Sequence, residues 1–186
     1  MCEAVKISTK QASCHIFTYK EGLISYLGHD LKLRVDNFTV DFIEASRKIT
    51  STFDLHSIVV EAVVKDGVEL DSVLSEKECL EICQNISSKI FSDPKGKITF
   101  ESSAITATDD GFDLQGILAV NGHQQQVDLV LFGQNGQLRL EHTINQPQFG
   151  IKPFSAMLGA IKIKPDVKVV LTIFDLDPLP KFVRQY

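Results

Sequence analysis

The sequence predicts a mainly all-β protein, an antiparallel β-barrel of about eight strands with one inserted amphipathic helix. Polar and apolar residues alternate along most of the chain, as in strands with one buried face. Turn signals such as Asn121-Gly122 and Asn135-Gly136 join consecutive strands as hairpins, which implies antiparallel pairing. A sheet of this length usually curls or closes, and closure removes its exposed edges.

The first half of the chain is dominated by this two-residue alternation. We expect strands at residues 12–20, 31–36, 39–45, 49–55 and 58–64. The apolar stretch 23–27 leads into Gly28-His29-Asp30, and Asp66-Gly67 ends the series.

One segment has helical rather than strand periodicity, at residues 76–91. Ser75 and Glu78 have the spacing of a capping box at its start, and Asp93-Pro94 ends it. Its apolar stripe consists of Cys79, Ile82, Cys83, Ile86 and Ile90. We expect this stripe to dock on the barrel wall or to close one end of it.

Strands resume in the second half, at residues 98–104, 112–120, 126–132, 138–145, 160–164 and 167–175. The connection 148–159 carries two Phe, a Met and a Leu between glycines, and so apolar a loop needs a surface to cover. It is predicted to cover an open barrel end, with a packed sandwich corner as the alternative. No linker or repeat divides the chain, so residues 1–186 are expected to form one domain with an ordered core of about 12–175.

Composition limits the function classes. The 186 residues include 12 Phe and no Trp, which suits an apolar cavity and a plain core equally. The net charge is -5 and the Lys and Arg residues are scattered, so neither nucleic acid binding nor a cationic membrane-surface patch is expected. No apolar run is long enough for a transmembrane helix. The N-terminus lacks a secretory signal, which predicts a cytoplasmic protein.

Chemical motifs are sparse. The four cysteines are interpreted as buried free thiols in a reducing compartment, because Cys79 and Cys83 supply only half of a metal site. The chain lacks H-E-x-x-H, G-x-S-x-G, G-x-G-x-x-G and P-loop patterns, so we expect no enzyme, no metal and no cofactor. Two alternatives stay open: a metal-assisted enzyme using His29, His123 and His142, and a filled barrel serving as an interaction or stress-response module.

The order of several short motifs resembles that of the YceI-like family. The matching segments are Gly28-His29-Asp30-Leu31, Ile98–Ser102 as I-x-F-x-S, Gly116–His123 as a G-x-L-x-x-x-G hairpin, and Phe149-Gly150-Ile151 followed by Met157-Leu158-Gly159 and Val167. Together they span about residues 12 to 174. Glu69–Glu76 stands where the family has an R-D-x-H-L segment. The resemblance implies a lipocalin-like barrel that binds a polyisoprenoid or related long-chain lipid.

The function predicted from these observations is noncatalytic binding or carriage of a long-chain apolar amphiphile in the barrel lumen. The partner would be a lipid or isoprenoid, and a homodimer is left open. His142 shares a strand face with Leu138, Leu140 and Ile144, so it is either a hydrogen-bonded core histidine or a contact for the ligand headgroup. The predicted lining and lid residues are Phe17, Phe38, Phe53, Phe100, Leu118, Leu140, His142, Phe149, Phe154 and Met157.

Overall fold

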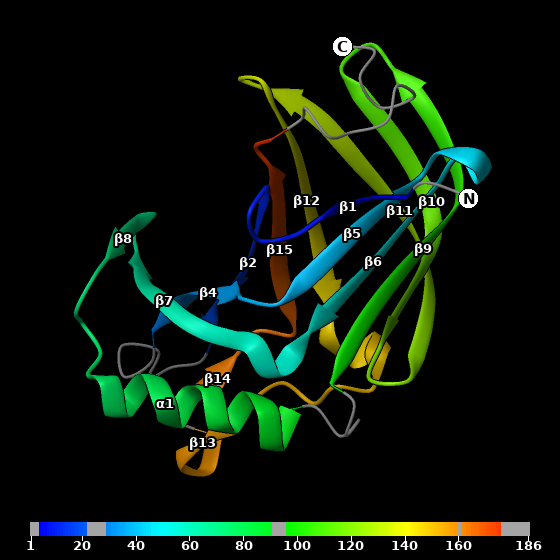
Figure 1. Ribbon diagram of the computed structural model, residues 1–186. Coiled ribbons are helices and arrows are strands. Elements are labelled where there is room, and N and C mark those ends of the chain that lie inside the picture. The colour runs from blue at the N-terminus through cyan, green and yellow to red at the C-terminus, as the bar shows by residue number, and fades with distance from the viewer. Residues whose placement is uncertain (1–3, 22–28, 91–95, 160, 176–186) are drawn as a thin grey trace.

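Figure 1 shows the computed structural model of the protein, which describes residues 4–21, 29–90, 96–159 and 161–175. The side chains of Lys89, Ile90, Gln134 and Met157 are outside this description. The apolar stretch predicted at residues 23–27 and the helix stop at Asp93-Pro94 also lie outside the described residues.

The main sheet is antiparallel and holds twelve strands in the order β1-β5-β6-β9-β10-β11-β12-β15-β2-β4-β7-β8. The strands are β1 (Ala4–Ile7), β2 (Ala12–Thr18), β4 (Asp30–Val35), β5 (Phe38–Ile43), β6 (Lys48–Asp54), β7 (Ile58–Lys65), β8 (Val68–Leu70), β9 (Lys97–Thr108), β10 (Gly111–Val120), β11 (His123–Gln134), β12 (Gln137–Asn145) and β15 (Asp166–Ile173). A second sheet of three short strands has the order β13-β14-β3, from Ser155–Ala156, Ile161–Ile163 and Lys20–Glu21. The prediction of a mainly antiparallel β protein is confirmed.

The predicted closed barrel of about eight strands is wrong, because the sheet is not closed and has twelve strands. The strands predicted at 31–36, 39–45, 49–55 and 58–64 are present as β4, β5, β6 and β7. These four strands form one bent ribbon, in which β5 pairs with β6 and β4 pairs with β7. The ribbon's two halves belong to opposite ends of the sheet, since β6 pairs with β9 and β4 pairs with β2. The short strands β1 and β8, which the alternation did not predict, add one strand at each end.

The corner of the ribbon is fixed by hydrogen bonds. The backbone N–H of Asp36 donates to the carbonyl of Ser57 at 3.1 Å, and that of Asn37 donates to Ser57 Oγ at 2.9 Å. Asp54 donates its N–H to the carbonyl of Asn37 at 2.9 Å. The bend is visible in Figure 1 where β4 passes into β5 and β6 into β7. The curvature of the sheet therefore comes from this bend in the ribbon. It does not come from hydrogen bonds between the first and the last strand of the sheet.

Hairpins join β9 to β12 in sequence, as the turn signals predicted. Asn121 and Gly122 have φ of 52° and 79°, and Asn135 and Gly136 have φ of 52° and 73°. Two consecutive left-handed residues make a turn whose twist matches that of the flanking strands. The predicted inner face of β10 is confirmed, since Phe112, Leu114 and Leu118 are buried while Asp113 and Gln115 are exposed.

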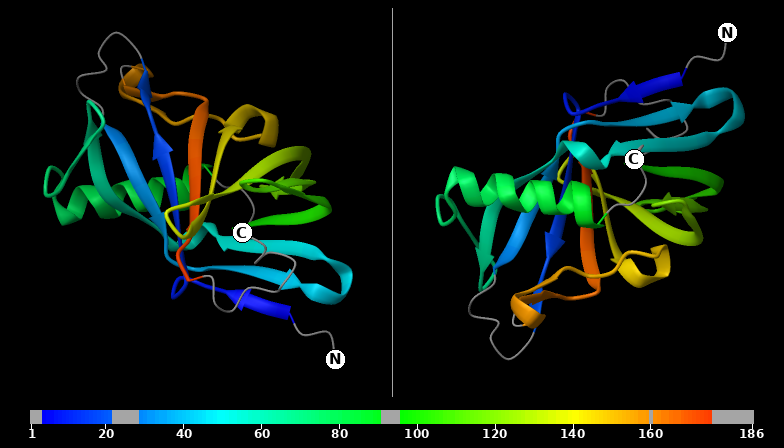
Figure 2. Two further views of the ribbon diagram at one scale, coloured as in Figure 1. Left: turned by 90° about the horizontal axis from the view of Figure 1, so that it is seen from above. Right: turned by 90° about the horizontal axis from the view of Figure 1, so that it is seen from below.

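The predicted helix begins at the expected residue. Helix α1 runs over Glu76–Asn85, and the Ser75–Glu78 capping box is formed in both directions. The chain then continues as a π-helix, η4, over Ile86–Ile90. Seen from below, α1 lies across the lower end of the curved sheet (Figure 2). None of the helices among the described residues is long and apolar enough to cross a membrane.

The connection after β12 is more regular than the predicted loop. Gln146–Phe149 forms a 3₁₀ turn, η5, and Met157–Gly159 forms another, η6, between β13 and β14. The apolar side chains of β14, Ile161 and Ile163, are half-buried, while Lys162 between them is exposed. This segment lies at the same lower end of the molecule as α1 (Figure 1).

Candidate functional site

Two cavities lie inside the curved sheet. The narrow chamber has a volume of about 110 Å³, and the wide chamber has a volume of about 300 Å³. Ligand pockets of folded proteins have volumes of roughly 300–1,000 Å³. The sheet therefore encloses space that its own side chains do not fill.

The two chambers are contiguous. Five apolar residues line both of them and form a waist between them: Ile16, Leu55, Ile98, Ile144 and Val169. They come from β2, β9, β12, β15 and the 3₁₀ turn after β6, so the waist crosses the lumen from several sides. The two chambers therefore adjoin, with these five apolar side chains at their boundary.

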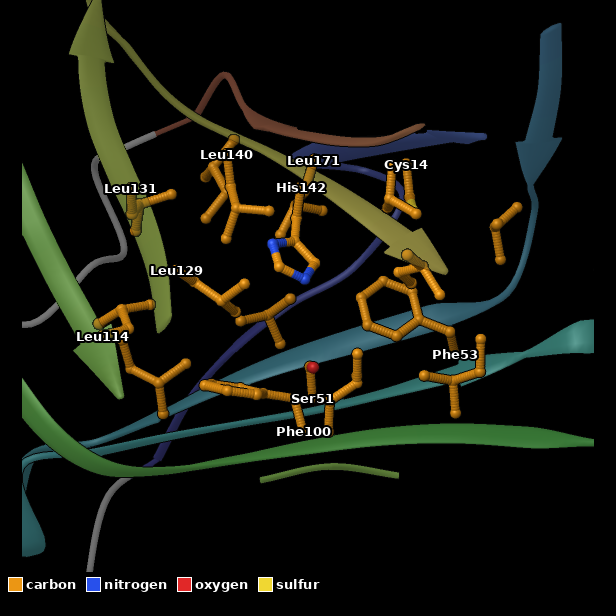
Figure 3. A pocket seen from close by; sticks show the side chains of 18 of the residues that line it. Cys14, Ser51, Phe53, Phe100, Leu114, Leu129, Leu131, Leu140, His142 and Leu171 are labelled. Carbon is orange, nitrogen blue, oxygen red and sulfur yellow. The ribbon is translucent and has the colours of Figure 1, made fainter. Parts of the chain in front are cut away.

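The narrow chamber is almost entirely apolar, and Figure 3 shows its interior. Leu114, Leu129 and Leu131 line it from β10 and β11, and Phe53 and Phe100 line it from β6 and β9. Apolar side chains facing empty space provide a surface that an alkyl or isoprenoid chain can cover, gaining roughly 25 cal/mol per Å² removed from water.

Two polar side chains enter this chamber from opposite walls. The imidazole of His142 on β12 points into the lumen, and the hydroxyl of Ser51 on β6 points toward it from the other side (Figure 3). Within the described part of the chain neither side chain has a hydrogen-bond partner, although Ser51 is only 7% exposed. Burial lowers the pKa of His142, so its imidazole is neutral at pH 7 and offers one donor and one acceptor. The pair can therefore bind a hydroxyl, carbonyl or carboxyl group.

The wide chamber lies between the sheet, α1 and the small second sheet. Ile82 and Asn85 of α1 and Ile86 of η4 line it from the helix side. Phe154, Ile161 and Ile163 line it from the connection after β12. The helical segment and this connection therefore act as covers of the chamber, as the sequence analysis expected for both.

The wide chamber also holds an unpartnered polar group. Thr18 of β2 lines it, and the buried Thr18 Oγ1 has no hydrogen-bond partner in the structure. Gln146, by contrast, is held by its own chain, because its side-chain amide donates to the carbonyls of Lys164 and Pro165 at 3.1 and 3.3 Å. An unpaired buried hydroxyl costs free energy unless a water or a ligand satisfies it.

A glycine makes room for Phe100 in the narrow chamber. A Cβ on Gly116 of β10 would lie 2.4 Å from the carbonyl oxygen of Glu101 and 2.6 Å from the Phe100 ring. The register between β9 and β10 also shifts at Gln115/Gly116. The glycine of the G-x-L-x-x-x-G segment thus has a packing role that its sequence spacing did not reveal.

Six of the ten predicted lining residues face a chamber. Phe53, Phe100, Leu118, Leu140 and His142 line the narrow one, and Phe154 lines the wide one. The structure brings these six together from β6, β9, β10, β12 and the connection before β13. Whether any of them contacts a ligand stays a prediction.

The other four are placed differently. Phe17 lies between the lining residues Ile16 and Thr18, so its side chain is on the opposite face of β2. The Lys168 ammonium lies over the Phe17 ring, 5.0 Å from the ring centroid. Phe38 is buried and stacks on Phe53 at 5.4 Å, behind the chamber wall. Phe149 is buried in η5 and lines neither chamber, and the side chain of Met157 lies outside the described residues.

Sequence reasoning missed Ser51 and Thr18. Both are small hydroxyl residues on inward strand faces, at i±2 from apolar lining residues such as Phe53 and Ile16. The two-residue spacing was visible in the sequence. It points to a ligand contact only once the structure shows a cavity in the lumen. Cys14 was interpreted as a buried thiol; it lines the narrow chamber, and burial raises its pKa to about 12.

The histidines that the metal-enzyme alternative required are spread over three places. His142 lines the narrow chamber and His29 the wide one. The ring of His123 lies against Gly150, where a Cβ would come within 2.4 Å of it, and its Nδ1 is 3.1 Å from the carbonyl of Asn121. Among the described residues, no group of three or more His, Cys, Asp or Glu side chains could hold a metal. The filled-barrel alternative is likewise at odds with the two chambers.

Comparison with known proteins identifies solved structures of similar fold. No protein-family model matches the sequence, and no curated protein matches it significantly. The crystal structure of BcnA from Burkholderia cenocepacia superposes with a TM-score of 0.60 at 16% identity, covering 88% of this chain and 95% of BcnA. The YceI protein of Campylobacter jejuni matches with a TM-score of 0.45 at 15% identity, covering 75% of this chain and 83% of that protein.

Similarity at this level of identity concerns the fold and not the ligand. BcnA is itself a YceI-like protein, and its match extends over nearly its whole length. The motif resemblance found in the sequence is thereby confirmed at the level of the fold. The chain has a YceI-like fold.

Proposed function

We propose that the protein is a noncatalytic carrier that holds one long-chain apolar amphiphile, a polyisoprenoid or a related lipid, across both chambers. The single observation that carries this proposal is that two apolar chambers adjoin at the waist defined above, so that one elongated molecule would extend from one into the other. An elongated ligand uses such a space, whereas a compact metabolite would need more polar partners than the walls offer. The YceI-like resemblance supports the same class of ligand.

The polar group of the ligand lies beside His142 and Ser51 in this proposal. Both side chains face the lumen without a partner in the described part of the chain, so a ligand hydroxyl or carbonyl would satisfy them. The alkyl or isoprenoid chain passes the waist into the wide chamber, where each buried methylene contributes about 0.8 kcal/mol. Among the described residues no hydrogen bond joins the His142 imidazole to Ser51 or Cys14, as a nucleophile and its base would require, and this favours binding over catalysis.

Two measurements test the proposal. Native mass spectrometry of the purified protein should reveal a co-purifying amphiphile, and the polyene fatty acid cis-parinaric acid should bind with increased fluorescence. Ile144→Trp, which fills the waist, should weaken that binding by at least about tenfold, because the chain can no longer cross. Val130→Trp is the matched control, since Val130 is 54% exposed on the outer face of β11. Equal binding by all three proteins, or no binding by any, contradicts the proposal.

The headgroup assignment has a separate test. Hexadecanol should displace the probe better than hexadecane in the wild type. In His142→Phe and Ser51→Ala variants that advantage should shrink by about two- to twelvefold, the range of one neutral hydrogen bond of about 0.5–1.5 kcal/mol. An unchanged preference in both variants would place the headgroup elsewhere in the lumen.

A further inference from the structure

One surface feature differs from the rest of this acidic chain. Between His142 and Pro165 the sequence carries Lys152, Lys162 and Lys164 and no Asp or Glu, although the whole chain has a net charge of -5. All three lysines are exposed, and among the described residues none of them forms an ion pair. The described residues of the segment 152–164, here called the basic hairpin, are therefore locally cationic, although the scattered Lys and Arg residues predicted no cationic surface patch.

The tip of the basic hairpin presents an apolar side chain to solvent. Leu158 is 110% exposed, the highest value among the exposed large hydrophobic residues, and its backbone has φ of 55°. A branched aliphatic residue rarely adopts this left-handed conformation, and such outliers concentrate at functional sites. No packing contact among the described residues accounts for this exposure or this backbone conformation.

The basic hairpin is also part of the wall of the wide chamber. Phe154, Ile161 and Ile163 face that chamber, while Lys162 points outward between the two isoleucines. Figure 1 places β13 at the extreme lower end of the molecule, beyond α1. The exposed tip is thus continuous with the cover of the cavity.

We infer that the basic hairpin docks the protein on the surface of an anionic lipid bilayer, with Leu158 inserted among the acyl chains and the three lysines at the headgroups. Exposed apolar residues flanked by lysines bind such surfaces through apolar burial and electrostatic attraction together. A bilayer offers anionic headgroups to the lysines and acyl chains to the exposed Leu158 at the same surface, and this combination favours a membrane over a second copy of this chain. Glu21, opposite Lys162 in the second sheet, and the exposed Asp166, two residues after Lys164, are neighbouring negative charges that reduce the attraction in part. The inference goes beyond the proposed carrier function, because docking needs no ligand in the chambers.

Vesicle co-sedimentation tests this inference on the full chain. The protein should bind vesicles of phosphatidylcholine with about one-third phosphatidylglycerol, bind pure phosphatidylcholine far less, and dissociate as salt screens the surface charge. Leu158→Ser should weaken binding about tenfold. Replacing Lys152, Lys162 and Lys164 together by Gln should remove most of the preference for anionic vesicles, at about fivefold per lysine.

Matched controls separate docking from general effects. Leu80→Ser removes another exposed leucine, 62% exposed on α1, and Lys10, Lys65 and Lys97 replaced together by Gln remove the same amount of charge elsewhere. Both controls should sediment with anionic vesicles like the wild type. Sedimentation velocity of the wild type and of Leu158→Ser tests whether a second copy of this chain binds the basic hairpin instead. A wild-type dimer that the Leu158→Ser substitution dissociates would overturn the membrane assignment.

The docking inference and the carrier proposal fail in different assays. All variants should keep the wild-type circular dichroism spectrum and the wild-type affinity for cis-parinaric acid, since Leu158 and the three lysines line neither chamber. Absence of vesicle binding by the wild type, or an equal loss in the control variants, refutes docking while leaving the cavity assays untouched.

Discussion

Gly116 shows how a single missing side chain shapes the lumen. Gly116→Ala would place a methyl group 2.4 Å from the carbonyl oxygen of Glu101, which is backbone and cannot rotate away. We expect a loss of about 1–3 kcal/mol in the free energy of unfolding, measured by urea denaturation. Gly122→Ala is the useful comparison, because a Cβ there meets no atom within 4 Å and only the strain of its φ of 79° opposes it. A smaller loss at Gly116 than at Gly122 would contradict the packing argument.

His142 should make stability depend on pH. Burial lowers the pKa of His142 below the ordinary 6.5, so the unfolded chain takes up the proton first as the pH falls. The stability associated with the neutral imidazole is complete above pH 6.5 and is lost as the pH falls from there toward the folded-state pKa. His142→Phe should lack this loss, and denaturation curves at several pH values between about 7 and 5 would measure it.

His15 provides a control in the same pH range. Its pKa is also lowered, mainly by burial and against the opposing charge of Glu61, so it titrates in both the wild type and His142→Phe. The difference between the two proteins therefore isolates His142. Parallel curves for the two proteins would show that the buried imidazole does not govern the pH dependence.

Helix α1 is weakly attached to the rest of the molecule. None of its residues is fully buried, although Ile82 and Asn85 line the wide chamber. Elements with few buried contacts open locally more often than core strands. In hydrogen exchange, amides of α1 should exchange faster than those of β10 and β11, and bound cis-parinaric acid should slow α1 selectively. Uniform exchange along the chain, with or without the probe, would contradict α1 as the cover that opens.

The capping box gives a sharper test of the same element. Ser75 Oγ accepts from the Glu78 N–H at 3.3 Å, and the Glu78 carboxylate accepts from the Ser75 N–H at 2.8 Å. Ser75→Ala should destabilise the helix by about 1 kcal/mol and speed exchange in α1 without affecting β10. Ser87→Ala serves as the control, because the Ser87 hydroxyl only donates to the Gln84 carbonyl at 3.1 Å near the helix end.

At the scale of the whole molecule, a charged network ties together the last strands of the sheet. Glu61 of β7 lies 3.1 Å from His15 Nε2 of β2, 3.0 Å from Lys32 Nζ of β4 and 3.2 Å from Arg34 Nη1 of β4. Lys32 also pairs with Glu69 of β8 at 3.0 Å. Burial alone would raise the pKa of Glu61, but the Lys32 ammonium and the His15 charge hold it below its ordinary value.

This network should contribute to acid stability. A carboxylate with a depressed pKa stabilises the fold above pH 4.5, and that contribution is lost as the pH falls through the folded-state pKa. Glu61→Gln should lower the free energy of unfolding by about 1–2 kcal/mol at pH 7 and flatten its fall in acid. Glu44→Gln, an exposed acidic residue of the β5–β6 turn that forms no ion pair among the described residues, should change neither.

Local patterns predicted much of this molecule. Alternation identified the inner faces of β10 and β12, and therefore placed Leu118, Leu140 and His142 in the lumen. The capping box placed the first residue of α1. Each of these features depends on residues that are close in sequence.

What the sequence left undetermined depends on distant contacts. Phe17 lies outside the chambers because the register of β2 against β15 turns Ile16 inward, and a shift by one residue would reverse that choice. Ser51 and His142 face the same chamber from strands far apart in the chain, and only the curved sheet brings them together. The divisions between β4 and β5 and between β6 and β7 were predicted, but strand alternation could not show that the two halves of this ribbon belong to opposite ends of the sheet.

The bent ribbon has a consequence for how cargo enters. The backbone is continuous from β4 into β5 and from β6 into β7. The two halves of the ribbon therefore cannot separate at this corner to form a lateral opening. Separation of strands along that line would require the chain itself to break. In the proposed carrier, loading and release would instead proceed at the end of the enclosure that α1 covers, and the time that α1 spends displaced would set the rate of exchange.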